Sequence, residues 1–174
     1  MTINELVIWL EKNNIYFFHF TAAPNLVGIG KYGLLSMHEI RRLGLETLPG
    51  GNDVSLGADL ACGMDKYVHL CLKRDHPMAY RAEREARIVD LRWLKINPNV
   101  LLLPGVMVTD QVSNKNGVVP QLPMALLPKA DWQVLYTRTD WNDPAIQERL
   151  KGAKKWEVLV PLHVPPEYIR NLNG

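Results

Sequence analysis

The sequence predicts a single α+β domain, and three observations support this fold class. Its 174 residues are enough for one well-cored domain and too few for two ordinary ones. Short strand-like and helix-like segments follow one another without the regular strand–helix–strand rhythm of a doubly wound sheet. Hydrophobic residues make up 47% of the chain and charged residues 22%, which is close to the average for globular proteins. We therefore expect one ordered domain over residues 1–174.

The chain opens with a predicted amphipathic helix. Thr2 and Glu5 have the spacing of a capping box, in which each side chain bonds the backbone of the other residue. Apolar residues then recur on one helical face, at Ile3, Leu6, Val7 and Leu10. We expect this face to pack on the core.

A buried strand is predicted next, over residues 16–21, because this segment is strongly aromatic. The two-residue period of a strand places His19 and Thr21 on the same side. Pro24 can begin the helix that follows, and Gly33 can end it.

The middle of the chain predicts a long loop followed by three more strands. Residues 44–63 are rich in Gly, Asn, Asp and Pro, which indicates a loop over a site. Apolar or alternating patterns predict core strands at 67–72, 87–96 and 105–109.

A helix and a strand are predicted near the C-terminal end. Asp143 can cap a helix that begins at Pro144, with Ile146 and Leu150 on its buried side. Residues 156–160 then form a mostly apolar run that predicts a late strand.

Charge and cysteine content exclude several functions. A formal net charge of only +2 speaks against a histone-like role, so basic residues that meet nucleic acid must be concentrated locally. Cys62 and Cys71 have neither the number nor the spacing of a metal site or a disulfide framework. We expect both to be reduced core thiols, and we expect no metal.

Motifs for targeting and for common nucleotide sites are absent from the sequence. The N-terminus has no basic and apolar leader, and no apolar window approaches the roughly 18 residues of a membrane span. The expected protein is soluble and cytoplasmic, without a membrane partner. Neither GxGxxG nor GxxxxGK occurs, so a dinucleotide would bind without a Rossmann fingerprint or a P-loop.

Glu157 is the acid in the otherwise apolar run 156–160, and the local pattern allows two interpretations. Alternation favours an outward-facing residue on a half-exposed strand. The functional alternative is a carboxylate in the wall of a cleft, where it stabilises an oxocarbenium-like centre or deprotonates a nucleophile. Local sequence does not choose between them.

Two other sets of residues have the same ambiguity. His19 is compatible with a packed core histidine, but Thr21 on the same face lets the pair bond a ribose or an amide. A basic run precedes Glu157, and it is compatible with a solvated helix face or with a phosphate-binding surface. Its members are Arg149, Lys151, Lys154 and Lys155.

Ordered blocks over nearly the whole chain form a family pattern. The blocks are His19-Phe20-Thr21 with Asn25-Leu26 and Gly33-Leu34-Leu35; Asp65-Lys66-Tyr67-Val68 with Pro77-Met78; Val108-Thr109-Asp110 with Asn114 or Asn116; and Asp131-Trp132, Trp141, Glu157 to Val160 and Val164 to Ile169. With these blocks the sequence resembles the DarT family, NAD-dependent enzymes that ADP-ribosylate bases in DNA.

The resemblance implies an ADP-ribosyltransferase-like fold, with two small packed β-sheets around an NAD cleft and flanking helices. It implies that Glu157 is the transferase glutamate and that NAD, as substrate, binds at His19, Thr21, Asn25 and Tyr67. The family also uses an arginine upstream of the Tyr67 block, for which Arg42, or its neighbour Arg41, is the candidate. The segment from Trp141 to Trp156, with its basic run, would face the nucleic-acid acceptor.

The implied function is a toxin that transfers ADP-ribose from NAD to a base, with single-stranded DNA favoured. Such an activity implies an antitoxin, either a macrodomain or a direct binder, and a role of the phage-defence kind. The family is aromatic-rich where this chain has Leu70-Cys71-Leu72, a departure that makes RNA a rival acceptor. A protein acceptor and a non-catalytic module that binds NAD or nucleic acid are the remaining alternatives.

Overall fold

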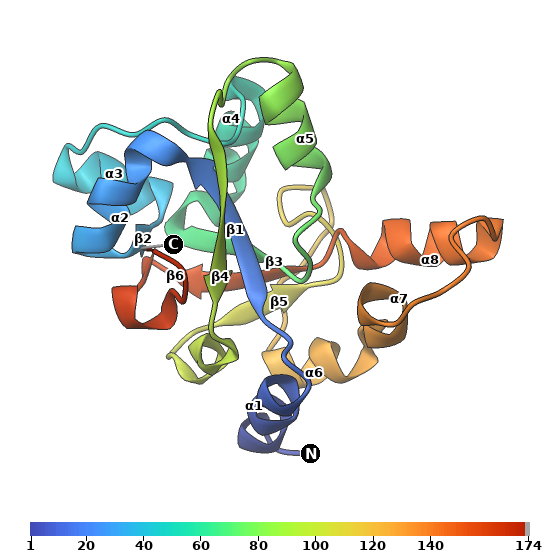
Figure 1. Ribbon diagram of the computed structural model, residues 1–174. Coiled ribbons are helices and arrows are strands. Elements are labelled where there is room, and N and C mark those ends of the chain that lie inside the picture. The colour runs from blue at the N-terminus through green and yellow to red at the C-terminus, as the bar shows by residue number, and fades with distance from the viewer. Residues whose placement is uncertain (173–174) are drawn as a thin grey trace.

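The computed structural model describes residues 1–172, and in that range it contains two antiparallel sheets (Figure 1). The larger sheet has five strands in the order β4-β1-β3-β6-β5, and the smaller one pairs β2 with β7. The strands are β1 (Phe17–Ala22), β2 (Leu34–Leu35), β3 (Tyr67–Cys71), β4 (Leu91–Ile96), β5 (Met107–Thr109), β6 (Glu157–Pro161) and β7 (His163–Val164). This mixture confirms the predicted α+β class.

Helices surround the sheets. They are α1 (Ile3–Lys12), α2 (Leu26–Tyr32), α3 (Met37–Leu43), α4 (Asp53–Cys62), α5 (Pro77–Arg84), α6 (Pro123–Leu126), α7 (Trp132–Tyr136) and α8 (Pro144–Ala153). Figure 1 shows α2 and α3 beside β2 at one end of β6, and α7 and α8 at the other end. Within residues 1–172, the helices are all too short or too polar to cross a membrane.

The predicted start of the chain is confirmed. The Glu5 backbone N–H donates to Thr2 Oγ1 over 3.2 Å, and the Thr2 N–H donates to Glu5 Oε2 over 2.6 Å, which completes the capping box. Leu6, Val7 and Leu10 are buried against the main core. Helix α1 therefore packs on the main core with the face that the apolar pattern selects.

The predicted boundary at Gly33 is also confirmed. Pro24 lies in a short 3₁₀ turn that leads into α2, and Gly33 ends the helix with a φ of +76°. A left-handed backbone favours glycine because it has no Cβ to clash.

Strand β6 lies between β3 and β5, and the side chains from Glu157 to Val160 are all buried. Burial of consecutive residues means that both faces of the strand are covered. Of the two interpretations of Glu157, the outward-facing residue on a half-exposed strand is therefore wrong. The alternation of residues within one strand does not predict this burial, because the second face of β6 is covered by segments distant in the sequence.

The predicted loop over residues 44–63 is only half correct. Its second part folds as α4, in which Asn52 Oδ1 accepts the Ser55 N–H over 2.9 Å at the start and Gly63 adopts a φ of +76° at the end. Capping at both ends stabilises a helix whose composition alone favours a loop.

The strand predicted at 87–96 begins only at Leu91, because its first part closes α5, which the pattern did not reveal. The backbone N–H groups of Arg87 and Ile88 both bond the Ala82 carbonyl, and Ala86 has a φ of +53°. Cys71 is a buried free thiol, whereas Cys62 is exposed at the end of α4, so its predicted place in the core is wrong.

Candidate active site

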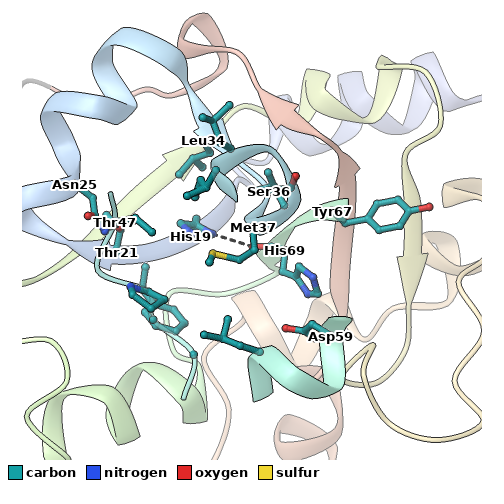
Figure 2. A pocket seen from close by; sticks show the side chains of 18 of the residues that line it. His19, Thr21, Asn25, Leu34, Ser36, Met37, Thr47, Asp59, Tyr67 and His69 are labelled. Carbon is teal, nitrogen blue, oxygen red and sulfur yellow. Dashed lines mark hydrogen bonds between the residues drawn. The ribbon is translucent and has the colours of Figure 1, made fainter. Parts of the chain in front are cut away.

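A cavity of about 300 Å³ lies between the sheets and helices α2 to α4, within the size range of ligand pockets. Its walls come from β1, α2, the loop 45–51, α4, β3, the loop 112–114 and the first residue of β6. Figure 2 shows side chains from these distant segments converging on one space. Five of the predicted site residues line it: His19, Thr21, Asn25, Tyr67 and Glu157.

Glu157 lies in the pocket wall and is only 4% exposed. It pairs with Cys71 of β3 on one side and with Thr109 of β5 on the other. Its Oε2 accepts the Ser113 backbone N–H over 2.9 Å. Burial pushes the pKa of Glu157 upward, but His69 and Ser113 outweigh burial and hold it below its ordinary value. The carboxylate is therefore ionised at neutral pH.

His69, from β3, contacts Glu157 directly. Its Nδ1 lies 3.4 Å from Glu157 Oε2 and 3.2 Å from Ser113 Oγ, and its Nε2 lies 3.0 Å from the Met64 carbonyl oxygen. Burial alone lowers the pKa of His69, but the neighbouring Glu157 carboxylate raises it to about 9. The ring is an imidazolium at neutral pH, and it donates from both nitrogens.

His19, in contrast to His69, is neutral. Its Nδ1 lies 3.0 Å from the His69 carbonyl oxygen, the bond drawn as a dashed line in Figure 2. Burial lowers the pKa of His19. A neutral imidazole next to a carbonyl must place its hydrogen on Nδ1, which leaves Nε2 as an acceptor.

Asn25 fastens the loop 45–51 to β1. Its Nδ2 donates to Thr21 Oγ1 over 3.0 Å and to the Leu48 carbonyl over 2.9 Å, and its Oδ1 accepts the Leu48 N–H over 3.0 Å. Figure 2 shows Asn25 and Tyr67 at opposite edges of the pocket. Asn25 thus shapes one edge of the pocket through the loop.

We expect Asn25→Ala to loosen this loop, because it removes all three hydrogen bonds. The free energy of unfolding should fall by about 1–2 kcal/mol, and amide hydrogen exchange at Leu48 should become faster. Asn142→Ala, on an exposed turn, is the matched control. Unchanged exchange at Leu48 would contradict the clamp.

Two further ionisable groups line the pocket. Asp59 of α4 is half-buried, burial raises its pKa, and its Oδ1 has no partner within residues 1–172. His76 is 5% exposed, burial lowers its pKa, and its Nε2 likewise has no partner in that range. The His76 ring stacks on Phe20, with 6.4 Å between the ring centroids. Both open polar atoms are suited to meet a ligand.

The structure does not bring the predicted arginine into the pocket. Arg42 is exposed on α3, where its guanidinium bonds Glu39 with distances of 2.6 and 3.0 Å. Arg41 pairs with the buried carboxylate of Asp65 instead. Among residues 1–172, neither arginine nor lysine lines the cavity. Arg42 lies on the face of α3 that points to solvent, and the spacing of residues in the sequence did not reveal which face of the helix it occupies.

The predicted acceptor surface lies outside the cavity, on the α8 side. Trp141 is 44% exposed, and Lys73 Nζ lies 5.2 Å from the centroid of its ring. Lys154, one residue beyond α8, pairs with Asp75. Since Glu157 begins β6 three residues later, this surface is continuous in sequence with the pocket wall.

The rest of the basic run is partly neutralised. Arg149 donates two hydrogen bonds of 2.7 and 2.9 Å to Asp131. Lys151 Nζ lies 3.5 Å from Glu148 on the exposed face of α8, and Lys155 is partly exposed beyond the helix. Arg149 therefore ties α8 to α7, which is a structural contact.

His69, Ser113, Asp59 and His76 were missed as site residues. A usable signal existed only for His69, because it lies two residues after Tyr67 and so shares its side of the strand. Ser113 reaches Glu157 from a loop 44 residues away, and no local pattern marks such a contact.

A cleft lined by both sheets, with a buried glutamate in its wall and helices outside, is the arrangement expected of an ADP-ribosyltransferase. The family model for DarT, described as ssDNA thymidine ADP-ribosyltransferase, matches residues 18–172. The chain belongs to the DarT family, which confirms the resemblance.

Solved structures agree on the fold. Thermus sp. 2.9 DarT in complex with ADP-ribosylated ssDNA superposes with a TM-score of 0.67 at 17% identity, covering 89% of this chain and 78% of that one. The complex of the same protein with NAD+ gives 0.61 at 20% identity, covering 90% and 79%. Thermosipho africanus DarTG with ADP-ribose gives 0.62 at 17% identity over 89% of this chain.

This chain spans only 42% of the Thermosipho DarTG chain. No curated protein matches the sequence. At identities of 17–20%, the structural likeness establishes the shared fold.

Proposed function

We propose that this protein transfers ADP-ribose from NAD+ to a thymidine base in single-stranded DNA and releases nicotinamide. Membership of the DarT family supports the reaction, and the complexes of Thermus DarT with NAD+ and with ADP-ribosylated ssDNA support both substrates. The observation on which the proposal depends is the ionised carboxylate of Glu157, held in the wall of a ligand-sized pocket.

The bond changes define what the site must do. The glycosidic bond between ribose C1″ and the nicotinamide nitrogen breaks, and its electron pair neutralises the positive pyridinium ring. The ribose becomes oxocarbenium-like, and a lone pair of the thymine ring nitrogen forms the new bond to C1″. That nitrogen loses its proton, so the products are the ADP-ribosylated base, nicotinamide and one proton.

Glu157 is placed to serve the reacting ribose. Its Oε2 is occupied by Ser113 and His69, whereas Oε1 meets no protein donor within residues 1–172. We assign Oε1 to the ribose 2″-hydroxyl, where the negative charge stabilises the oxocarbenium-like centre. The same carboxylate takes the proton from the acceptor nitrogen and passes it to water.

The nicotinamide end of NAD+ is assigned to the segment from His19 to Asn25. A neutral His19 suits this place, because a protonated ring would repel the positive pyridinium. Thr21 and Asn25 fix the loop that closes this edge, and Tyr67 lines the opposite edge.

The acceptor strand is assigned to the α8 side of Glu157. Exposed Trp141 offers a ring on which an unpaired base stacks, and Lys73, Lys151, Lys154 and Lys155 supply positive charge. Lys73 and Trp141 already contact each other, so they would meet the strand as a unit. Arg149 is not assigned to the acceptor strand, because its guanidinium bonds Asp131 and links α8 to α7.

The departure at Leu70-Cys71-Leu72 gives no support to an RNA acceptor. Leu70 and Leu72 are almost fully buried in the main core, and Cys71 lies 7% exposed next to Glu157. Leu70 and Leu72 are packed in the core and do not select between DNA and RNA, and Cys71, which lines the cavity, is a small side chain beside Glu157.

A host that makes this enzyme needs protection from it, so the proposal includes an antitoxin, either a macrodomain that removes ADP-ribose or a direct binder. The likeness to Thermosipho DarTG supports such a partner. We propose that the enzyme acts in the cytoplasm, where NAD and DNA meet, and a role in phage defence stays a prediction.

The test is to incubate the protein with NAD+ labelled in its adenylate half and with separate pools of DNA, RNA and protein. We expect label in single-stranded oligonucleotides that contain thymidine, and none in matched oligonucleotides without it. Label confined to RNA or protein would overturn the DNA acceptor. Binding of NAD+ without label in any pool would instead favour the non-catalytic module.

A further inference from the structure

We infer that His69 is a positioning residue for Glu157: its imidazolium orients the carboxylate and supplies the positive charge that neither arginine nor lysine supplies to this pocket. The inference rests on the proposed function of Glu157 as the transferase glutamate. It adds a residue that the local pattern and the family blocks left without a role.

The sheet register brings the two side chains together. Strands β3 and β6 are antiparallel neighbours, with Cys71 opposite Glu157 and His69 opposite Leu159. His69 and Glu157 are thus diagonal neighbours, which is within reach for long side chains.

The His69 ring is held from both edges. Nε2 lies 3.0 Å from the Met64 carbonyl oxygen, which turns Nδ1 towards Glu157 Oε2 and Ser113 Oγ. Oε2 also accepts the Ser113 N–H. Oε2 is therefore the carboxylate oxygen that the protein holds, which leaves Oε1 for the substrate.

The groups around His69 favour its charged form. Glu157 approaches from β6 and Asp59 from α4, and both carboxyls stabilise a cation at this position. Figure 2 shows Asp59 and His69 on the same side of the pocket. Asp65 lies farther away, near Asp59, and its own partner is Arg41.

The remaining titratable neighbours do not compete for this role. Burial lowers the pKa of His19 on β1 and of His76 before α5, so both rings are neutral at pH 7. Burial raises the pKa of Cys71 on β3, so its side chain remains a thiol. His69 is then the charged histidine among the described residues that line the pocket, and its pKa of about 9 keeps it so.

The pocket needs such a cation. Glu46, Asp59 and Glu157 are among the residues that line it, and neither arginine nor lysine lines it within residues 1–172. A buried carboxylate without a cation would be driven towards its neutral form. Without its charge, Glu157 would not stabilise an oxocarbenium-like ribose.

Two titrations should therefore limit the transfer rate. Protonation of Glu157 ends activity on the acid side, and loss of the His69 proton reduces it near pH 9. His69→Asn places an amide donor near the Nδ1 position but removes the charge. In this variant the charge of His69 no longer lowers the pKa of Glu157, so that pKa rises and the acid limb should move to higher pH by about one unit or more.

The experiment compares pH–rate profiles of steady-state transfer to a thymidine-containing strand. We expect His69→Asn to lower kcat by about tenfold or more at pH 7.5, to shift the acid limb upward and to lose the alkaline limb. KM for NAD+ should change by less than about threefold, because the assigned nicotinamide contacts are elsewhere. His163→Gln, on an exposed histidine of β7, is the control and should keep the original profile.

A folded His69→Asn protein with an unchanged kcat and unchanged pH limbs would overturn the inference. If that variant does not fold, nitrogen NMR of histidine-labelled unmodified protein replaces it. We expect the His69 ring to be doubly protonated at pH 7.5 and to titrate near pH 9, and a neutral ring at pH 7.5 would overturn the inference. Failure of the proposed function is separate, because it would appear as absent transfer by the unmodified protein.

Discussion

Glu157→Gln is expected to lower the rate of ADP-ribose transfer to single-stranded DNA by about 10³-fold. The amide has nearly the same shape as the carboxylate and can still accept the Ser113 N–H through its oxygen. It has no negative charge, so it neither stabilises the oxocarbenium-like ribose nor accepts the proton of the base. The loss should fall on kcat, because the charge acts mainly after the glycosidic bond begins to break.

The measurement is single-turnover transfer from labelled NAD+, with circular dichroism and thermal unfolding to verify the fold. Glu167→Gln, on an exposed turn, is the matched control and should retain full activity. NAD+ binding by the Glu157→Gln protein should remain measurable. Full transfer by a folded Glu157→Gln protein would remove Glu157 from the mechanism.

Gly33→Ala is expected to cause a large loss of stability. Gly33 has a φ of +76°, and a Cβ at this position would lie 2.2 Å from the Val164 carbonyl oxygen. The close neighbour is backbone of β7, which pairs with β2 directly after Gly33, so no side chain can rotate away. We expect the free energy of unfolding to fall by about 3 kcal/mol or more.

Gly44→Ala is the matched control. Gly44 also has a positive φ, of +64°, but a Cβ there meets nothing within 4 Å. It should cost only about 1 kcal/mol, the conformational penalty alone. The difference between the two variants, measured by denaturant unfolding, isolates the contact between α2 and β7. Equal losses would show that this contact is not tight.

Local sequence was sufficient to predict the helix boundaries that depend on residues close together along the chain. The capping box of α1, the stop at Gly33 and the start of α8 at Asp143 and Pro144 all appear where they were predicted. Each depends on hydrogen bonds or dihedral angles within a few residues. The ordered family blocks likewise sufficed for the fold class and for membership of the DarT family.

Local sequence did not predict helix α4 or the position of the Arg42 side chain. The composition of residues 53–62 resembles a loop, but the caps at Asn52 and Gly63 stabilise a helix that forms one wall of the pocket. Arg42 is near the expected place in sequence, yet the turn of α3 points it to Glu39 and solvent. Helical phase relative to the sheet depends on packing, which spacing does not specify.

The sequence by itself determined that Glu157 is an acid in an apolar strand and that it belongs to an ADP-ribosyltransferase family. Only the tertiary structure decided that this carboxylate is buried, ionised and bonded to Ser113 and His69. The reason is physical: a charge state depends on burial and on the neighbouring charges. Those neighbours come from segments 44 and 88 residues away along the chain.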